Sequence, residues 1–525
     1  MPRRQPDGIA TMQSAIDLAP RRSLILPAAL SILIIFASYF FLLLLAGLSV
    51  YLPYWLLDET TSAGSPFSGI ASQFMLLLLG GVIVAASIVW SLLPRRMKFQ
   101  PPGVLLDRAT NARLFAEVDA VSNALNEPAP SEIYLMAAAN AYVAEVGGVL
   151  AFGKRRIMAL GLPLVSVLSV SEFRALLAHE SAHFYSGDTS LAPWVYRARL
   201  GLLRTIQNME HTQEVIHLQA FRVMAVLARA VIEKYFILFL RMTGQISRQQ
   251  ELRADELACW VAGRESARSC LEKIHATDLL WTIYWTAAVE PVLKHRFLPD
   301  LAEGFRRFLA NSGIAGHFKL DVTDELESPE PDRFSSHPPL ARRVLAIEKM
   351  EAPERTLDDT LASSLFDGLH LAERSLVEFS DLRTARGTLS SVAWDDVASQ
   401  VTIPSWRAEV AALRGLITGV TAAALPEFKN NLSKITSRMP DPQGRLLTVR
   451  EREHRAVHLL GIAVTLLLLH KGWELRSQPG LFKFEKDGED LPVFEIVNDV
   501  LTGEISPEDW LQKCTHLGIA DEPLA

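Results

Sequence analysis

The stretch His179-Glu180-Ser181-Ala182-His183 places two imidazoles four residues apart, with a carboxylate between them. On an α-helix, positions i and i+4 share a face about 6 Å apart, so two neutral imidazole nitrogens can bind one zinc ion at about 2.0–2.1 Å each. Glu180 would lie beside the metal, where its carboxylate can take a proton from a zinc-bound water and pass it to the leaving amine. This arrangement predicts peptide-bond hydrolysis.

The residues around the motif predict a helix from Ser171 to Ser186. Ser171 and Glu172 offer an N-cap, and Gly187 offers a C-cap directly after the last turn. The helix also has an apolar face, made by Phe173, Leu176, Leu177 and Ala178. Two histidines on such a helix can be ordinary core or surface residues, but the caps and the apolar face favour a metal site.

A catalytic zinc site needs a third protein ligand and an open fourth position. Glu251 is the best candidate, because it shares a helix face with Asp255 at i, i+4. Asp255 could then accept a hydrogen bond from the second ring nitrogen of His179 or His183. Carboxylates at this spacing are also common on solvated helix faces. Two weaker alternatives for the ligand are Glu210 and Glu214.

Four sequence blocks occur in the order of a known family. They are Asn140-Ala141-Tyr142, His179 to Asp188, Ser247-Arg248 with Glu251 and Ala254-Asp255, and Ser336-His337-Pro338-Pro339 with Arg343. Together they cover about residues 100–350 and resemble the HtpX-type membrane zinc endopeptidases, whose relatives include the mitochondrial Oma-type proteases and the CAAX prenyl endopeptidases. Four ordered matches are far more specific than any one of them.

The resemblance implies the ligands and the base of the site. One zinc ion per chain would be bound by His179, His183 and Glu251. Glu180 would be the general base. The expected enzyme is therefore a zinc metalloendopeptidase.

The resemblance also implies roles for four residues around the metal. Asp255 would accept a hydrogen bond from a metal-binding histidine and so hold its ring in place. Asp188 would tie the end of the active helix to its neighbours. His337 and Arg343 would lie near the cleft as donors that stabilise the tetrahedral oxyanion. A His-Pro-Pro turn is, however, more often only a helix boundary.

Short strands are predicted before the active helix, at residues 132–136, 140–143 and 156–160. Substrate can add to an edge strand as an antiparallel strand, so that its backbone is bound and its sequence matters less. Asn140, Ala141 and Tyr142 are the residues expected to bind substrate in this way. An interior strand without substrate contact is the alternative.

Two apolar segments predict membrane spans. Residues 24–51 and 74–93 contain no charged side chain, and each is long enough to cross the hydrocarbon core. Arginines and lysines flank the pair, whereas the loop 58–73 has none, which predicts cytoplasmic flanks and a cytoplasmic catalytic domain. With the family resemblance, this indicates a multi-pass protein of a bacterial inner membrane.

A third apolar segment, residues 221–240, carries a polar stripe. Arg222, Arg229 and Glu233 recur at i, i+7 and i+11. Because charges inside a membrane are costly, the stripe favours an amphipathic helix packed on the domain or lying at the membrane surface. A membrane span is the alternative, and it would require a fourth crossing.

Composition agrees with an anchored enzyme. The chain has 525 residues, 49% of them hydrophobic, with a mean hydropathy of +0.18. A net charge of −7 and a pI near 6.0 do not indicate a nucleic-acid-binding protein. The three cysteines do not have the spacing of a metal-binding pair. The expected partners are a protein or peptide substrate and a lipid membrane.

The expected fold is α+β and predominantly helical. Residues 1–100 would form the membrane anchor, 101–350 the gluzincin-type peptidase domain with a small sheet, 351–450 a helical accessory region and 451–525 a small α+β module. The C-terminal region could recruit a partner protein or mediate self-association.

The leading functional interpretation is a membrane-anchored endopeptidase that acts in membrane protein quality control or regulated proteolysis. A membrane-bound scaffold on a peptidase fold, with a latent metal site, is the runner-up. Glu180 disfavours it, since a scaffold needs no base beside its metal. A CAAX-type prenyl endopeptidase is a weaker alternative, because those proteins carry more membrane helices.

Overall fold

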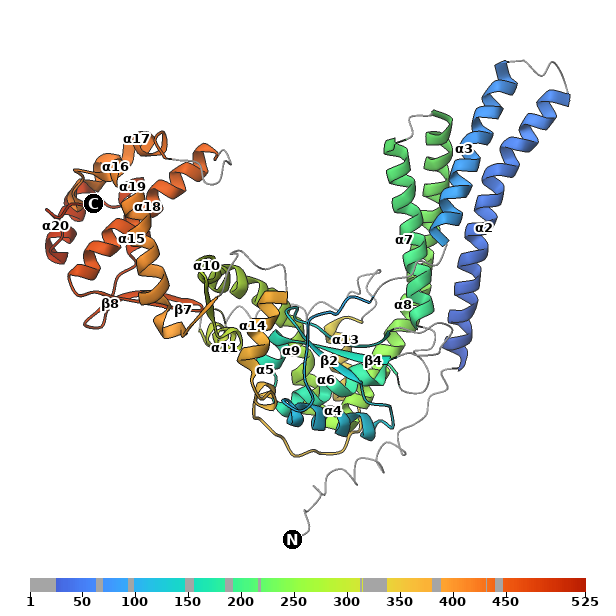
Figure 1. Cartoon of the computed structure of the whole chain (residues 1–525), viewed down its shortest axis with the longest axis horizontal. Helices are drawn as coiled ribbons and strands as arrows, with labels where there is room; N and C mark the ends of the chain where they lie inside the picture. Colours follow the sequence, from blue (N-terminus) through green and yellow to red (C-terminus); the bar gives the residue numbers. More distant parts are fainter. Residues whose placement is uncertain are drawn as a thin grey trace, which may run out of the picture. The chain divides into compact units, whose positions relative to one another are not determined.

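The computed structural model describes residues 25–62, 69–92, 99–146, 155–184, 192–215, 219–311, 314, 338–379, 389–430, 432–439 and 447–525. The chain forms two compact units, each with its own internal packing (Figure 1). Unit 1 contains residues 1–136, 140–275 and 321–367, and unit 2 contains residues 137–139, 276–320 and 368–525. The predicted α+β, predominantly helical fold is confirmed.

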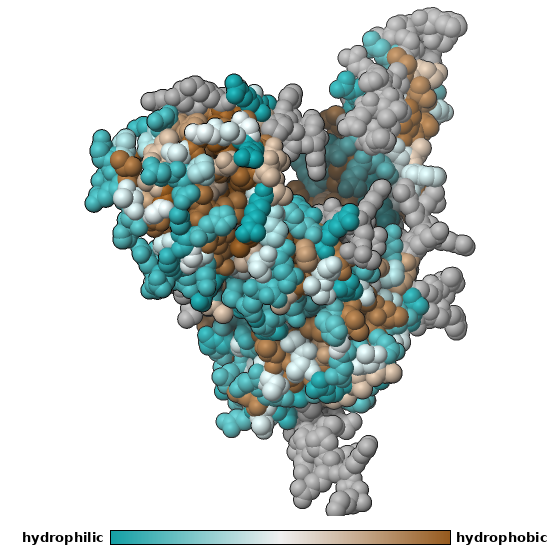
Figure 2. Space-filling model, turned by 60° about the vertical axis from the view of Figure 1, so that its left-hand side comes forward, coloured by the Kyte–Doolittle hydropathy of each residue, from teal (hydrophilic) through white to brown (hydrophobic). Residues whose placement is uncertain are grey.

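The two apolar segments form long helices, α2 (Ile25–Ser62) and α3 (Gly69–Leu92). Among the described residues, two stretches are long and apolar enough to cross a membrane, Ile32–Glu59 and Gln73–Leu92. Large apolar side chains on these helices face outward, as brown atoms at the upper right of Figure 2 show, and Phe36 is 70% exposed. Such a surface suits lipid, so the predicted membrane helices are confirmed.

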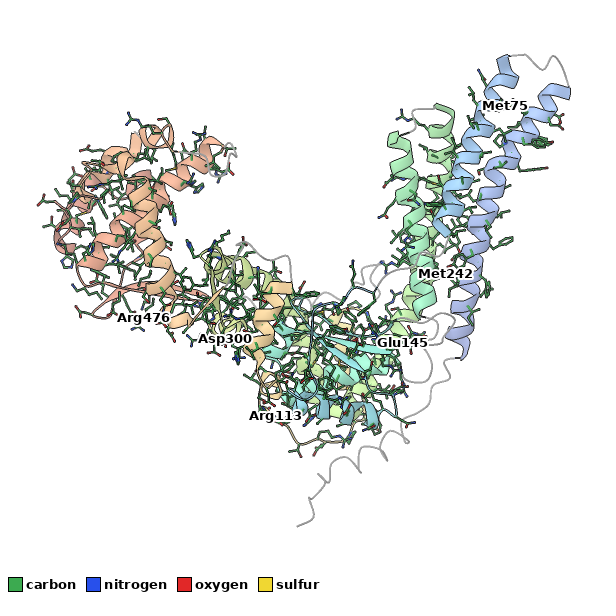
Figure 3. All side chains as sticks on the ribbon, in the orientation of Figure 1. Met75, Arg113, Glu145, Met242, Asp300 and Arg476 are labelled. Carbon is green, nitrogen blue, oxygen red and sulfur yellow. The ribbon has the colours of Figure 1, made fainter. Side chains whose placement is uncertain are left out.

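Helices α7 (Ala192–Val215) and α8 (Gln219–Ala262) pack lengthwise on α2 and α3. The Tyr235 ring stacks on Phe41 with centroids 4.1 Å apart, and its hydroxyl lies 3.0 Å from the Ser38 hydroxyl. Figure 3 shows Met75 on α3 and Met242 on α8 within this group of four helices.

Residues 221–240 form part of an amphipathic helix, as the polar stripe predicts. The buried apolar side chains of this segment pack on α2 and α3. The reason is a narrow seam of buried side chains at near-heptad spacing, formed by Ala225, Ala228, Ile232 and Phe239. On the polar stripe, Arg229 pairs with Glu210 at 2.8 Å and with Glu233 at 2.6 Å.

A four-stranded sheet lies in unit 1, with its strands in the order β1-β2-β4-β3. Its strands are β1 (Val104–Leu105), β2 (Glu132–Met136), β3 (Ala141–Val146) and β4 (Arg155–Gly161). The β2–β4 pair is parallel, and the β1–β2 and β3–β4 pairs are antiparallel. The predicted strands are therefore present, and β3 forms one edge of the sheet.

Helices α5 (Leu162–Val167) and α6 (Val170–Ala182) contact this sheet in unit 1. The same unit contains α4 (Ala112–Ala124), the C-terminal part of α8, the first part of α9 (Arg264–Tyr284), α13 (Leu340–Glu348) and the short 3₁₀ helix η3 (Ala362–Leu365).

The active helix α6 begins earlier than predicted. Its N-cap is Ser169 instead of Ser171, and Ser169 forms a reciprocal capping box with Glu172. The Ser171 hydroxyl is used elsewhere, since it accepts a hydrogen bond from the backbone N–H of Asp358. Glu172 also binds Lys273 at 2.8 Å, which fixes the start of α6 against α9.

Unit 2 contains the remaining elements. The first group is η2 (Trp285–Val289), α10 (Glu290–Lys294), β5 (Phe297–Pro299), α11 (Leu301–Ala310), α14 (Leu369–Phe379), β6 (Ser390–Val392), η4 (Trp394–Asp396) and η5 (Ala398–Thr402). The second is α15 (Ile403–Ala412), α16 (Arg414–Ile417), η6 (Ala422–Asn430), α17 (Leu432–Thr436), α18 (Val449–His470), β7 (Glu474–Gln478), β8 (Leu481–Lys486), β9 (Glu489–Asp490), α19 (Val493–Thr502) and α20 (Pro507–Leu517).

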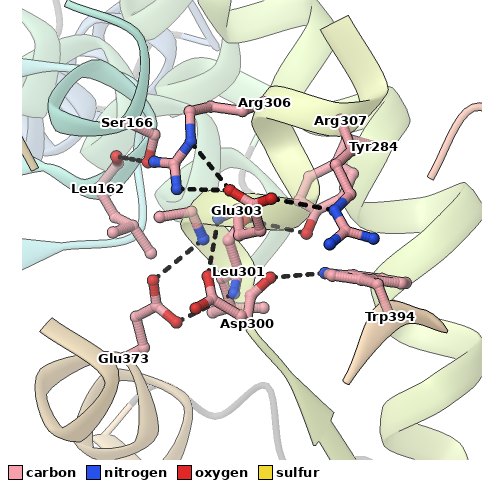
Figure 4. Close-up of polar contacts among 11 residues, drawn as sticks. Leu162, Ser166, Tyr284, Asp300, Leu301, Glu303, Arg306, Arg307, Glu373 and Trp394 are labelled. Carbon is pink, nitrogen blue, oxygen red and sulfur yellow. Dashed lines mark hydrogen bonds and ion pairs between the residues drawn. The ribbon is translucent and has the colours of Figure 1, made fainter. Parts of the chain in front are cut away.

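A buried carboxylate organises the start of α11 (Figure 4). Glu373 accepts hydrogen bonds from the backbone N–H groups of Leu301 and Ala302, both at 3.0 Å. The Asp300 side chain caps the same helix by accepting from the Glu303 N–H at 2.7 Å. Burial, together with the nearby Asp300 carboxylate, raises the pKa of Glu373 to about 7.

Candidate metal centre

Three donor side chains converge where α6 crosses α8. His179 Nε2 lies 3.5 Å from Glu251 Oε2, and His183 Nε2 lies 3.7 Å from Glu251 Oε1. The donor atoms of all three residues lie within 4.8 Å of one another. Two ligands at 2.0–2.1 Å on a tetrahedral zinc ion are about 3.4 Å apart, so this donor set fits one zinc ion.

The two helices place these donors by simple periodicity. His179 and His183 are one turn apart, with His183 at the C-cap of α6. Glu251 is almost fully buried on α8, which packs closely against α6. Because a buried carboxylate needs a positive partner, its position between two imidazoles suits a divalent cation.

The electrostatics of His179 support the same conclusion. Burial alone lowers the pKa of His179, but hydrogen bonds to Asp255 and Glu251 outweigh that effect and raise it to about 10. The surrounding carboxylates therefore stabilise positive charge at this position. A bound cation would supply that charge and leave the imidazole neutral, as a metal ligand must be.

Asp255 and Arg343 hold the ring of His179 in place. Asp255 Oδ1 lies 3.1 Å from His179 Nδ1, which turns Nε2 toward Glu251 and His183. Arg343 holds both oxygens of Asp255, with Nε donating at 2.9 Å and Nη2 at 2.6 Å. Its Nη2 also lies 3.7 Å from Glu251 Oε2. The sequence predicts that Arg343 donates to the oxyanion. In the structure its guanidinium donates to Asp255.

Two of the three donors, His179 and Glu251, line a cavity of about 530 Å³. The half-buried Glu180 lines it too, so the expected base faces the same space as these two donors. Asn140 and Ala141, at the start of β3, contribute to its wall. The geometry therefore brings a general base, a metal site and a strand edge together.

Several predicted residues lie elsewhere. Tyr142 on β3 is not among the residues that line the cavity. Asp188 and His337 lie outside the described residues, as does the predicted cap Gly187. Of the alternative ligands, Glu210 pairs with Arg229 on the α7–α8 pair, and the side chain of Glu214 lies outside the description.

Sequence reasoning missed the part of the cavity contributed by α5 and α9. These lining residues are Leu164, Ala267, Cys270, Leu271, Ile274 and His275. Apolar positions that line a cavity carry the same period as positions that fill a core, so no local signal marks them.

Two histidines and a glutamate around a possible metal site, with a further carboxylate beside them, are typical of a metallopeptidase. Comparison with known proteins agrees with this class. Residues 108–351 match the family model described as peptidase family M48. This part of the chain therefore resembles the M48 peptidases, which are metal-dependent, and the HtpX-type resemblance predicted from the sequence is confirmed.

Two curated relatives illustrate the similarity. "Protease HtpX" of Thioalkalivibrio sulfidiphilus is 27% identical over 203 residues, which are 37% of this chain and 58% of the relative. "Protease HtpX homolog" of Thiobacillus denitrificans is 26% identical over 203 residues, with the same two coverages. The chain thus spans less than two thirds of the length of these relatives. Among solved structures there is no significant match.

Proposed function

We propose that this protein is a membrane-anchored zinc endopeptidase. The observation that carries the proposal is the convergence of His179, His183 and Glu251, with Glu180 lining the same cavity as His179 and Glu251. A zinc ion bound there would supply Lewis acidity, which polarises a peptide carbonyl and lowers the pKa of water to near 7. The carboxylate of Glu180 would accept the proton of the attacking water and donate it to the leaving amine.

Asp255 and Arg343 act as positioning residues in this proposal. Asp255 holds the His179 ring by its Nδ1 atom, and Arg343 fixes Asp255 through two parallel hydrogen bonds. Because such fixed outer partners hold a ligand in its binding orientation, they preorganise the donor set before the cation binds.

We propose that substrate lies along the edge of β3. Strand β3 pairs with β4 on one side, and Asn140 and Ala141 at its start line the cavity. A peptide added antiparallel to the other side would be held through its backbone, which permits loose sequence preference. Protein segments that are unfolded or detached from a membrane domain offer such a backbone.

The membrane arrangement is also part of the proposal. The catalytic region would face the cytoplasm of a bacterial inner membrane, as the basic flanks of the two spans indicate. Reporter fusions after residue 65 and after residue 105 should fall on opposite sides of the membrane, and a shared side would overturn the two-span arrangement.

A Glu180→Gln variant tests the proposed chemistry. Purified in detergent, it should retain about one zinc ion per chain but lose cleavage of casein, because the base is gone and the ligands remain. A Glu251→Ala variant is the matched control, since it should lose zinc as well as activity. Undiminished cleavage by Glu180→Gln would refute the mechanism, and a zinc-binding but inactive wild-type protein would favour a scaffold.

A further inference from the structure

The cavity has two chemically different halves. One half holds two of the candidate metal donors, His179 and Glu251, together with Glu180, Asp255 and Arg343. The other half is formed by apolar side chains from four helices, namely Leu164, Ala175, Leu176, Ala258, Ala267 and Leu271, and the polar residues Asn140 and His275 also line the cavity. A large side chain beside the reacting bond could therefore enter an apolar space while the bond itself stays among the charged groups.

The apolar half begins one helical turn from the metal donors. Helices α6 and α8 run antiparallel, since His179 meets Asp255 while His183 meets Glu251, four residues earlier on α8. Ala175 lies one turn before His179, and Ala258 lies one turn after Asp255, so the two alanines sit at the same level. Helix α9 contributes the further wall.

Small residues determine how deep this space is. Ala175, Ala258 and Ala267 come from three different helices, all line the cavity, and their exposed fractions are 2%, 4% and 5%. A larger residue at any of the three would occupy the space that the methyl groups leave. Leu164 and Leu271, which are also buried, make the walls apolar.

We propose that this apolar half is a specificity pocket for a large apolar side chain, such as Leu, Met or Phe, on a residue that flanks the scissile bond. The inference rests on the proposed peptidase function and deepens it by naming a substrate class. Acidic and basic side chains would lose their hydration in the pocket, so peptides that carry them at this position would be rejected.

Quenched fluorescent peptides that differ only at the positions flanking the cleaved bond test the proposal. At one flank, kcat/KM for Leu, Met or Phe should exceed that for Ala by at least about 10-fold, since each buried methylene is worth roughly 10–200-fold. Equal rates for Ala, Asp and Phe at both flanks would overturn the pocket while leaving the peptidase function intact. If wild type cleaves none of the peptides and no casein, the proposed function itself fails.

Two variants should move the preference in opposite directions. Ala267→Val fills the pocket and should shift the preferred residue toward Ala, whereas Leu271→Ala enlarges it and should favour Phe or Trp over Leu. A folding defect would lower kcat/KM for all peptides alike, so it cannot shift the preference of the two variants in opposite directions. Zinc content and the melting temperature of each variant provide the control, and identical preference profiles in both variants would contradict the assignment.

A binding measurement separates the pocket from turnover. A peptide with photo-leucine at the preferred flank, bound to the Glu180→Gln protein, should cross-link to α5 and α9 near Leu164 and Leu271. Ala267→Val introduced into that protein should remove these cross-links. Cross-links found only outside the cavity, or unaffected by Ala267→Val, would refute the inference.

Discussion

Asp255 offers the sharpest test of how the site is built. Its carboxylate lies 3.1 Å from Nδ1 of His179 and accepts both hydrogen bonds from Arg343, so it connects a proposed metal ligand to a buried guanidinium. An Asp255→Asn change keeps the shape but removes the charge. Loss of such an outer-shell partner lowers metal affinity by about 10–100-fold, which corresponds to about 1.4–2.7 kcal/mol.

The assay is competition for zinc against a chromogenic chelator at fixed pH. A double-mutant cycle with Arg343→Met then asks whether Arg343 acts through Asp255. If it does, Arg343→Met weakens zinc binding in the wild-type background but adds little once Asp255 is Asn. Zinc affinity of Asp255→Asn within about twofold of wild type, or strictly additive effects of the two changes, would show that this support is not coupled to the metal site.

Three further outcomes follow from contacts outside the metal donors. Ser169→Ala should lower the free energy of unfolding by about 0.5–2 kcal/mol, since it removes the N-cap of α6, and urea unfolding measures this loss. Glu373 has a folded-state pKa raised to about 7 from 4.5, so its contribution favours folding below pH 4.5 and is lost as pH rises to about 7, by roughly 3 kcal/mol. Thermal melts from pH 4 to 8 should show this decline, and Glu373→Gln should flatten it; an unchanged slope in the variant would contradict it. Tyr235→Phe should weaken the α2–α8 contact by about 0.6 kcal/mol, a small loss that unfolding in detergent can detect, and a loss of several kcal/mol would mean that the Ser38 contact was misjudged.

Local sequence patterns predicted much of the fold. The strands at 132–136 and 155–161 lie within a residue or two of the expected bounds, because short apolar runs of this length act as local strand signals. The start of α6 was missed by two residues. Two serines compete for that cap, and the distant Asp358 takes the second one.

The metal donors were predictable because their spacing is helical. His179 and His183 share a face, as do Glu251 and Asp255, and the packing of α6 on α8 brings the two faces together. The bidentate pairing of Arg343 with Asp255 joins side chains 88 positions apart. No periodicity within a helix encodes such a contact, so it required the tertiary structure.

Helix α8 is a single element of 44 residues that stacks Tyr235 on Phe41 in its N-terminal half and carries Glu251 in its C-terminal half. At 1.5 Å per residue, the 16 residues from Tyr235 to Glu251 span about 24 Å without a break. A tilt imposed on α2 by bilayer thickness would therefore be transmitted along α8 to Glu251, the proposed metal ligand. Hydrolytic rates measured in thin and thick bilayers should accordingly differ, even with the same soluble peptide.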